Sequence, residues 1–90
     1  MMKLYGQAIR GRLVMADTVA ENNDTDLPFQ DRLEKCFVQV CRDFDVSVPM
    51  WIARNTSEFV NFNRTIFHSE QFIDEIKFDR LVIEMVLDEK

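Results

Sequence analysis

The feature that most constrains this fold is an apolar stripe between residues 28 and 44. Large apolar side chains recur there at spacings of three and four, which is the period of one face of an α-helix. The stripe consists of Phe29, Leu33, Cys36, Phe37, Val40, Cys41 and Phe44. A helix of about five turns with one apolar face must lie on another apolar surface, and a small sheet is the surface that the rest of the chain offers.

Residues 3–21 predict a β-hairpin that supplies part of this sheet. Its turn is expected at Arg10-Gly11, because glycine tolerates the positive φ that a tight turn requires. One side of the second arm carries Leu13, Met15 and Val19. Asp17 interrupts that apolar side, so the register of the hairpin stays open, and a helix over residues 8–20 is the alternative.

Residues 78–89 predict the strand that completes the sheet. Alternation is clean over its whole length, which is typical of a strand with one buried face and one half-exposed face. One side carries Leu81, Ile83, Met85 and Leu87, and the other carries Arg80, Val82, Glu84 and Val86. Together with the hairpin, this strand predicts a three-stranded antiparallel sheet packed by one long helix.

The segment between the long helix and the last strand predicts an extended stretch and one or two short helices. Pro49 disfavours helical backbone in the residue before it. Asn55, with Glu58 three residues later, is typical of a pair that caps a helix, here one running through Phe62. Ser69 is expected to begin a further short turn.

Length and composition favour one dense domain over residues 1–90. Hydrophobic residues make up 47% of the chain and eight residues are Phe, whereas Gly and Pro occur only twice each. A chain of this size buries only about 60–65% of its unfolded surface, so large side chains must fill its core. We therefore expect a compact α+β fold with few long loops.

The charge pattern disfavours nucleic acids and membranes as partners. The net charge is −5 and the basic residues are scattered, whereas nucleic-acid binding draws on a basic face that neutralises phosphates. The same acidic balance argues against anionic membranes. The one exception is the start of the chain, where Lys3, Arg10 and Arg12 occur without an acid.

The sequence favours a cytoplasmic protein. Lys3 is not followed by an apolar block, so no signal peptide is indicated, and no apolar stretch approaches the length of a membrane span. In that compartment Cys36 and Cys41 stay as thiols. Five positions apart on a helix, their side chains point about 140° away from each other, which prevents a disulfide bond between them.

His68 is the only histidine, and its surroundings in the sequence do not predict a catalytic triad. A triad needs a histidine that contacts a nucleophile and an orienting acid. Ser57 and Ser69 are available, but neither lies in a Gly-x-Ser-x-Gly turn. We interpret His68 as a surface residue beside a helix and assign no catalytic residue.

No metal or cofactor is expected either. Asp74, Glu75 and Asp79 could meet a divalent cation, but such a cluster is more often a solvated helix end. Two Cys and one His lack the spacing of a zinc site. Glu75-Ile-Lys77 matches the Glu-x-Lys element of metal-dependent nucleases, yet an acidic chain does not supply the basic groove that those enzymes need.

Trp51, the only tryptophan, has two interpretations. It could be an exposed anchor for a partner, because Trp is enriched among the residues that dominate interface energies. It could instead cover one end of the core, with Pro49 fixing the direction of the chain. Small domains need their few large aromatic residues for the core, which favours the second interpretation.

The runs PMWIARNTSEF and FIDEIKFDRLVIEMV, together with the KLYG start, resemble a family of short bacterial proteins. The shared pattern is Pro-x-Trp, Asn-Thr-x-Glu-Phe and Phe-Ile-x-Glu-Ile-x-Phe-Asp, in fixed order over nearly the whole chain. The function of that family is not established. The resemblance therefore implies a cytoplasmic bacterial protein and brings no catalytic or ligand residues with it.

These patterns predict a small non-enzymatic protein that acts by binding other protein, with a homodimer as one form. The expected interaction residues are Trp51, Val82 and Val86. The alternative function is binding of a nucleic acid or a small ligand by the basic hairpin. Its residues would be Lys3, Tyr5, Arg10 and Arg12.

Overall fold

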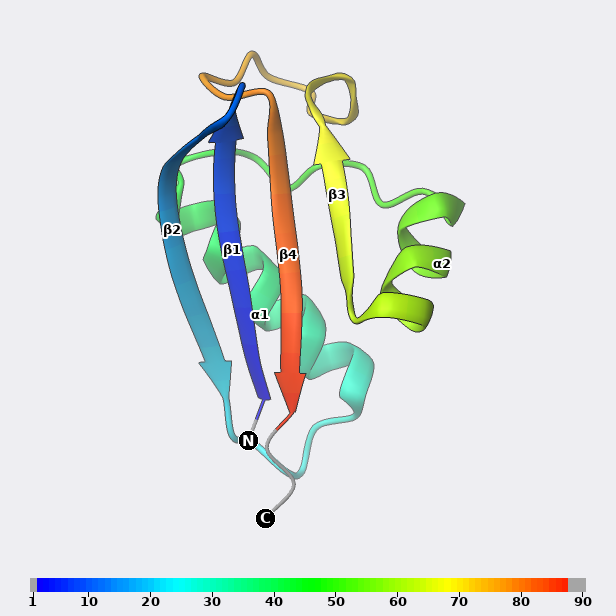
Figure 1. Ribbon diagram of the computed structural model, residues 1–90. Helices are drawn as coiled ribbons and strands as arrows, with labels where there is room; N and C mark the ends of the chain where they lie inside the picture. Colours follow the sequence, from blue (N-terminus) through cyan, green and yellow to red (C-terminus); the bar gives the residue numbers. More distant parts are fainter. Residues whose placement is uncertain (1, 88–90) are drawn as a thin grey trace.

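Four antiparallel strands, one more than the sequence predicts, form the sheet of this α+β fold (Figure 1). The computed structural model describes residues 2–87. The elements are β1 (Met2–Arg10), β2 (Leu13–Asn22), α1 (Phe29–Asp43), α2 (Ala53–Phe62), β3 (Arg64–His68), the 3-10 helix η1 (Ser69–Gln71) and β4 (Arg80–Leu87). The strand order is β2-β1-β4-β3. The α+β class is confirmed, and the prediction of a three-stranded sheet is wrong.

The strand that the sequence analysis missed is β3. It has only five residues, of which Thr65 and Phe67 are buried. It follows α2 directly, because Asn63 adopts a left-handed conformation with a φ of 58° and turns the chain at the end of the helix. Two buried positions are too few to establish a period of two, so alternation could not distinguish this strand from a loop.

The N-terminal hairpin is present, but its turn and its register differ from the expectation. The turn falls one residue later than predicted, with a φ of 61° at Gly11. A β-bulge lies at Met15, since its neighbours Val14 and Ala16 pair with consecutive residues of β1. The extra residue places Val14 on the same face as Asp17, which explains why simple alternation left the register open.

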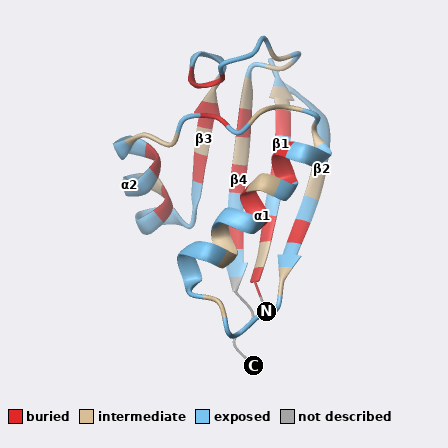
Figure 2. Cartoon of the chain, turned by 180° about the vertical axis from the view of Figure 1, so that it is seen from behind, coloured by how far each residue is buried: buried red, intermediate tan, exposed pale blue. Residues whose placement is uncertain are grey.

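The helix α1 covers one face of the sheet, as its apolar stripe predicts (Figure 2). The buried residues of the stripe are Cys36, Phe37, Val40 and Cys41. The helix comes very close to β1 at Gly6, where an added Cβ atom would lie 2.5 Å from Cγ1 of Val40. Only glycine leaves room for this approach, so the distance between helix and sheet depends on that residue.

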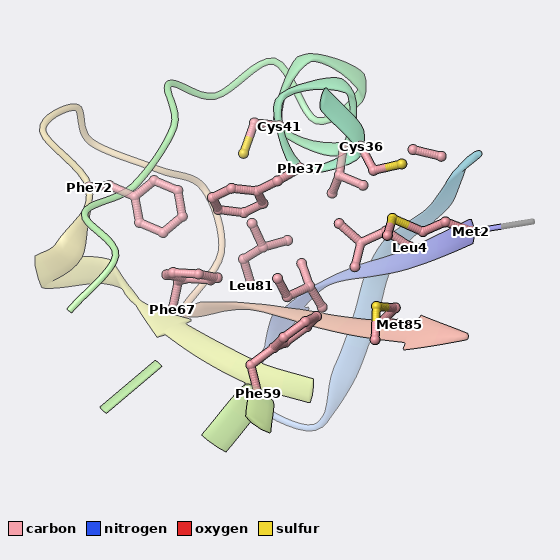
Figure 3. Close-up of a cluster of buried hydrophobic side chains, with 13 residues drawn as sticks. Met2, Leu4, Cys36, Phe37, Cys41, Phe59, Phe67, Phe72, Leu81 and Met85 are labelled. Atoms are coloured by element: carbon pink, nitrogen blue, oxygen red, sulfur yellow. The ribbon is translucent and has the colours of Figure 1, made fainter. Parts of the chain in front are cut away.

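The hydrophobic core lies between α1 and the sheet (Figure 3). Its buried members are Met2, Leu4, Ala20, Cys36, Phe37, Val40, Cys41, Phe59, Phe67, Phe72, Leu81, Ile83 and Met85. The rings of Phe37 and Phe67 stack with their centroids 5.0 Å apart. This stack joins α1 to β3, so the strand that was missed contributes a central residue of the core.

Trp51 packs against this core just before α2 begins. Its ring lies edge-on to Phe37 and Phe59, with centroids 5.8 and 5.7 Å away, and 5.4 Å from the ring of Phe67. The indole Nε1–H donates a hydrogen bond to Oγ1 of Thr56 at 2.8 Å. The side chain is half-buried, so its main contacts are made within the chain.

Candidate interaction surface

The face of the sheet opposite to α1 carries no helix among residues 2–87, and we call it the open face (Figure 1). β1 buries its even-numbered residues from Met2 to Ala8, so its odd-numbered residues and their register partners form this face. β1 and β2 contribute Lys3, Tyr5, Gln7, Ile9, Val14, Asp17, Val19 and Glu21. β4 and β3 contribute Arg80, Val82, Glu84, Val86, Arg64, Ile66 and His68. Both valines expected at an interaction surface therefore lie on the open face.

An open hollow of about 380 Å³ lies on this face. The open-face side chains that line it are Tyr5, Gln7, Asp17, Val19, Arg64, Val82 and Glu84. They come from all four strands, so the hollow extends across the width of the sheet. Tyr5 is 41% exposed. An exposed ring that carries a hydroxyl group is typical of protein-binding surfaces, because it offers apolar area and a hydrogen bond together.

Charge is distributed unevenly across the open face. β2, at one edge of the sheet, carries Asp17 and Glu21, whereas β3, at the other edge, carries Arg64 and His68. An ion pair joins Glu21 to Lys3 on the neighbouring strand, with 3.8 Å between Nζ and Oε1. The open face thus has two acids at one edge, Asp17 and Glu21, and the cation Arg64 at the other.

The outer edge of β3 is occupied by side chains of the same protein. Asn55, which is fully buried in α2, donates from Nδ2 to the carbonyl of Ile66 at 3.0 Å. The Ile66 N–H lowers the pKa of the Glu58 carboxyl. Gln71 accepts one from the His68 N–H at 3.0 Å. Because the Ile66 carbonyl and the His68 N–H already have partners, they are not available to a further strand.

The same side chains form a polar network that fixes the chain before α2. Nε2 of Gln71 donates to Oδ1 of Asn55 and to the carbonyl of Met50, both at 2.9 Å. Nδ2 of Asn55 also donates to Oγ1 of Thr65 at 2.8 Å. Asn55 is therefore not the residue that precedes the helix, as the sequence predicts, since α2 begins at Ala53. It caps α2 from the first helical turn, where its Oδ1 accepts the Ile52 N–H at 3.0 Å.

The other edge of the sheet is β2, whose outer side pairs with no strand among residues 2–87. Leu13 and Met15 are 68% and 53% exposed there. However, β2 also has the bulge at Met15 and the acids Asp17 and Glu21. Bulges and charges are the features by which edge strands avoid pairing with one another, so the open face is the better candidate for a protein contact.

The structure separates the three residues predicted at an interaction surface. Trp51 packs in the aromatic cluster on the α1 side of the sheet. Val82 and Val86 lie on the open face, where Val86 is 43% exposed and Val82 is half-buried. Sequence reasoning missed Arg64 and Ile66 on this face, because it missed β3.

The basic residues of the hairpin do not converge on one patch. Lys3 and Arg10 stand seven positions apart on β1, which is about 23 Å along a strand. Arg12 lies in the turn beyond Arg10. Lys3 already pairs with Glu21. These cations are therefore too widely spaced to hold one small ligand together.

The residues considered for chemistry lie apart from the hollow or have structural partners. His68 ends β3 opposite Arg80. Asp79 accepts the Gly11 N–H at 2.6 Å through Oδ2, and Arg80 donates to the Gly11 carbonyl at 3.3 Å, so both fasten the hairpin turn to β4. Within residues 2–87, no group of three or more His, Cys, Asp or Glu side chains is placed to hold a metal ion.

Both cysteines are free and buried, as their position on the apolar stripe predicts. Burial raises the pKa of the Cys41 thiol to about 12. Burial also raises the pKa of Cys36, and the positive charge of Arg32 opposes that rise in part. The thiolate is the nucleophilic form of cysteine, so a raised pKa disfavours reaction at either residue.

Comparison with known proteins finds no relative of this chain. No protein-family model, no curated protein and no solved structure matches it. The resemblance to short bacterial proteins therefore stays a prediction. In the part of the chain that the structure describes, no helix has the length and apolar character needed to cross a membrane.

Proposed function

We propose that this protein acts by binding another protein through the open face of its sheet. The hollow on that face carries the proposal, because it extends across all four strands and combines apolar with charged side chains. Protein interfaces share this composition, with an apolar centre inside a polar rim. Tyr5 and Val82 supply apolar area near the middle, and Asp17 and Arg64 supply charges toward the two edges.

The exposure of these side chains supports binding over catalysis. Tyr5, Asp17 and Glu84 are all exposed to solvent. Catalytic sites instead hold their charged groups in cavities that exclude water, where electrostatic interactions are strong. An open hollow is suited to a partner that brings its own apolar surface and displaces the water.

Site-specific photo-crosslinking in cells that naturally produce the protein tests this proposal. A benzophenone amino acid at position 5 replaces one aromatic ring by another in the hollow. We expect a discrete covalent adduct from this position. Val82→Arg should remove the adduct, because it places a charged side chain in the same hollow.

The matched control carries the same amino acid in place of Glu34, an exposed residue of α1. This position lies on the helix that covers the other face of the sheet, so it should give no adduct. The same amino acid is also placed at positions 19 and 82, which line the hollow beside position 5. If none of these three positions gives an adduct, or if position 34 gives the same adduct, the open face is not the binding surface.

A further inference from the structure

We infer that a second copy of this chain binds the open face, an inference that rests on the function proposed above. In this dimer the two open faces stack with a twofold axis running along the strands. β2 of each copy then lies over β3 of the other. Such a contact is isologous, since the same surface of both copies forms it.

The charges of the edge strands select this axis. If the axis ran across the strands, β2 would lie over β2 of the second copy, and Asp17 and Glu21 would face the same acids. With the axis along the strands, Arg64 of the second copy stands level with Val19, between Asp17 on one side and Glu21 on the other, so the acids lie near a cation and not near the same acids of the second copy. Like charges placed opposite each other cost several kcal/mol in an interface, so the second arrangement is favoured.

The central strands also complement each other in this arrangement. β1 lies over β4 of the second copy, because these two strands are in the middle of the sheet. Tyr5 and Glu84 are register partners and stand at the same height along the strands. The Tyr5 hydroxyl of one copy therefore faces the Glu84 carboxylate of the other, to which it can donate a hydrogen bond. The hollows of both copies meet at the axis.

The size of the open face indicates a reversible dimer. Four strands about 4.8 Å apart and eight residues long, at about 3.3 Å per residue, give a face of roughly 19 by 26 Å. This projected area of about 500 Å² per copy lies at the lower end of specific interfaces. We therefore expect a dissociation constant in about the micromolar range.

The edges of the sheet favour stacked faces over a sheet continued from one copy to the next. Asn55 and Gln71 form hydrogen bonds with backbone groups at the edge of β3. β2 has a bulge and two acids, which would oppose the same acids if two β2 strands paired side by side near Val19.

Sedimentation velocity of the purified chain from about 1 µM to about 1 mM tests the dimer. The wild type should change from monomer to dimer as concentration rises. Asp17→Arg places a cation one residue pair along the strands from Arg64 of the second copy, and Arg64→Asp places an acid at the same separation from Asp17. By symmetry each substitution makes two repulsive pairs, so each should raise the dissociation constant by about tenfold or more.

Mixing the two variants is the decisive measurement. An Asp17→Arg copy and an Arg64→Asp copy make only attractive pairs at these positions. The equimolar mixture should therefore dimerise at concentrations where either variant alone is monomeric. Glu34→Arg and Lys35→Glu, on the exposed surface of α1, change the net charge by the same amounts and should leave the dissociation constant unchanged.

A wild type that stays monomeric over the whole range overturns this inference. So does a dimer that neither Asp17→Arg nor Arg64→Asp weakens, or a mixture no stronger than the variants alone. Circular dichroism and urea unfolding of each variant identify any loss of fold. If the chain is monomeric but position 5 still gives a crosslinked adduct with another protein, the proposed function stands and only the identity of the partner is wrong.

Discussion

The two faces of the sheet share the same strands but lie in different environments. On the face covered by α1, Leu4, Phe67 and Ile83 are fully buried, whereas on the open face Tyr5 and Val86 are 41% and 43% exposed. Complete burial of a large apolar side chain contributes about 1.5–3 kcal/mol to folding. The covered face therefore stabilises the fold, and the open face retains apolar area that only a partner can bury.

The two faces should differ most in how much a substitution lowers the free energy of unfolding. Phe67→Ala should lower the free energy of unfolding by about 3–5 kcal/mol, because it removes a buried ring that stacks on Phe37. Val82→Thr, on the open face of β4, should change it by less than about 0.5 kcal/mol. Urea unfolding at a protein concentration below the dimer range measures both. Equal losses would show that the open face also belongs to the core.

Asn55→Ala tests whether the network at the β3 edge is as important as the apolar core. The substitution removes the hydrogen bonds that Asn55 makes with Gln71, Thr65, the Ile66 carbonyl and the Ile52 N–H. A hydrogen bond contributes about 0.5–1.5 kcal/mol, so we expect a total loss of about 3 kcal/mol. Asn61→Ala, at an exposed position of the same helix, is the control.

An Asn55→Ala protein as stable as the Asn61→Ala control would mean that the edge of β3 does not depend on this network. Hydrogen exchange of the Ile66 and His68 amides gives a second measurement at the edge itself. Their protection should fall in Asn55→Ala even if part of the stability is recovered by water molecules that enter the network.

Alanine substitutions of the neighbouring residues Gly6 and Gln7 allow the two faces to be compared at one point of β1. Gly6→Ala should destabilise the protein by about 1–3 kcal/mol, because its Cβ would overlap Val40 and push α1 away. At a position with free space, the same change would stabilise by about 0.4–1 kcal/mol. Gln7→Ala, on the open face, should change stability by less than about 0.5 kcal/mol.

A double-mutant cycle identifies the cause of the Gly6 effect. If the clash with Val40 is responsible, Gly6→Ala should cost less in a Val40→Ala background than in the wild type. If chemical denaturation shows that the losses in free energy of unfolding from Gly6→Ala and Val40→Ala simply add, the Gly6 effect arises from the conformation of the strand instead.

The covered face could largely be predicted from the sequence, whereas the open face could not. Periodicity is a property of one continuous segment, so it identified α1 and the buried side of β4. The open face depends on pairings between distant segments. Arg64 lies beside Glu84 only because the five-residue strand β3 pairs with β4.

The hairpin shows a second limit of the same kind. One extra residue at Met15 changes which side chains of β2 share a face. No local sequence pattern predicts such a bulge. The sequence therefore shows that Asp17 and Glu21 are acidic, but it does not show that they lie on the same face of the sheet. Trp51 shows the reverse case, because its size and rarity alone favoured the core position that the structure gives it.

The smallest expected effect concerns pH and the residue Glu58. The Thr65 hydroxyl donates to Glu58 at 2.6 Å and lowers the pKa of that carboxyl, and the Ile66 N–H and the charges of Arg54 and His68 act in the same direction. A carboxyl whose pKa is lower in the folded state stabilises the fold above its unfolded pKa of about 4.3. This stabilisation is lost as the pH falls through the folded-state pKa.

Urea midpoints of the wild type and of Glu58→Gln should therefore differ most near neutral pH and converge as the pH falls below about 4. The control is Glu34→Gln on the exposed surface of α1, which should follow the wild type at every pH. The predicted difference is small because Glu58 keeps contact with solvent, which weakens its charged interactions. If the gap between wild type and Glu58→Gln instead widened toward low pH, the carboxylate would be a cost to the fold, and the edge of β3 would be held by Asn55 and Gln71 alone.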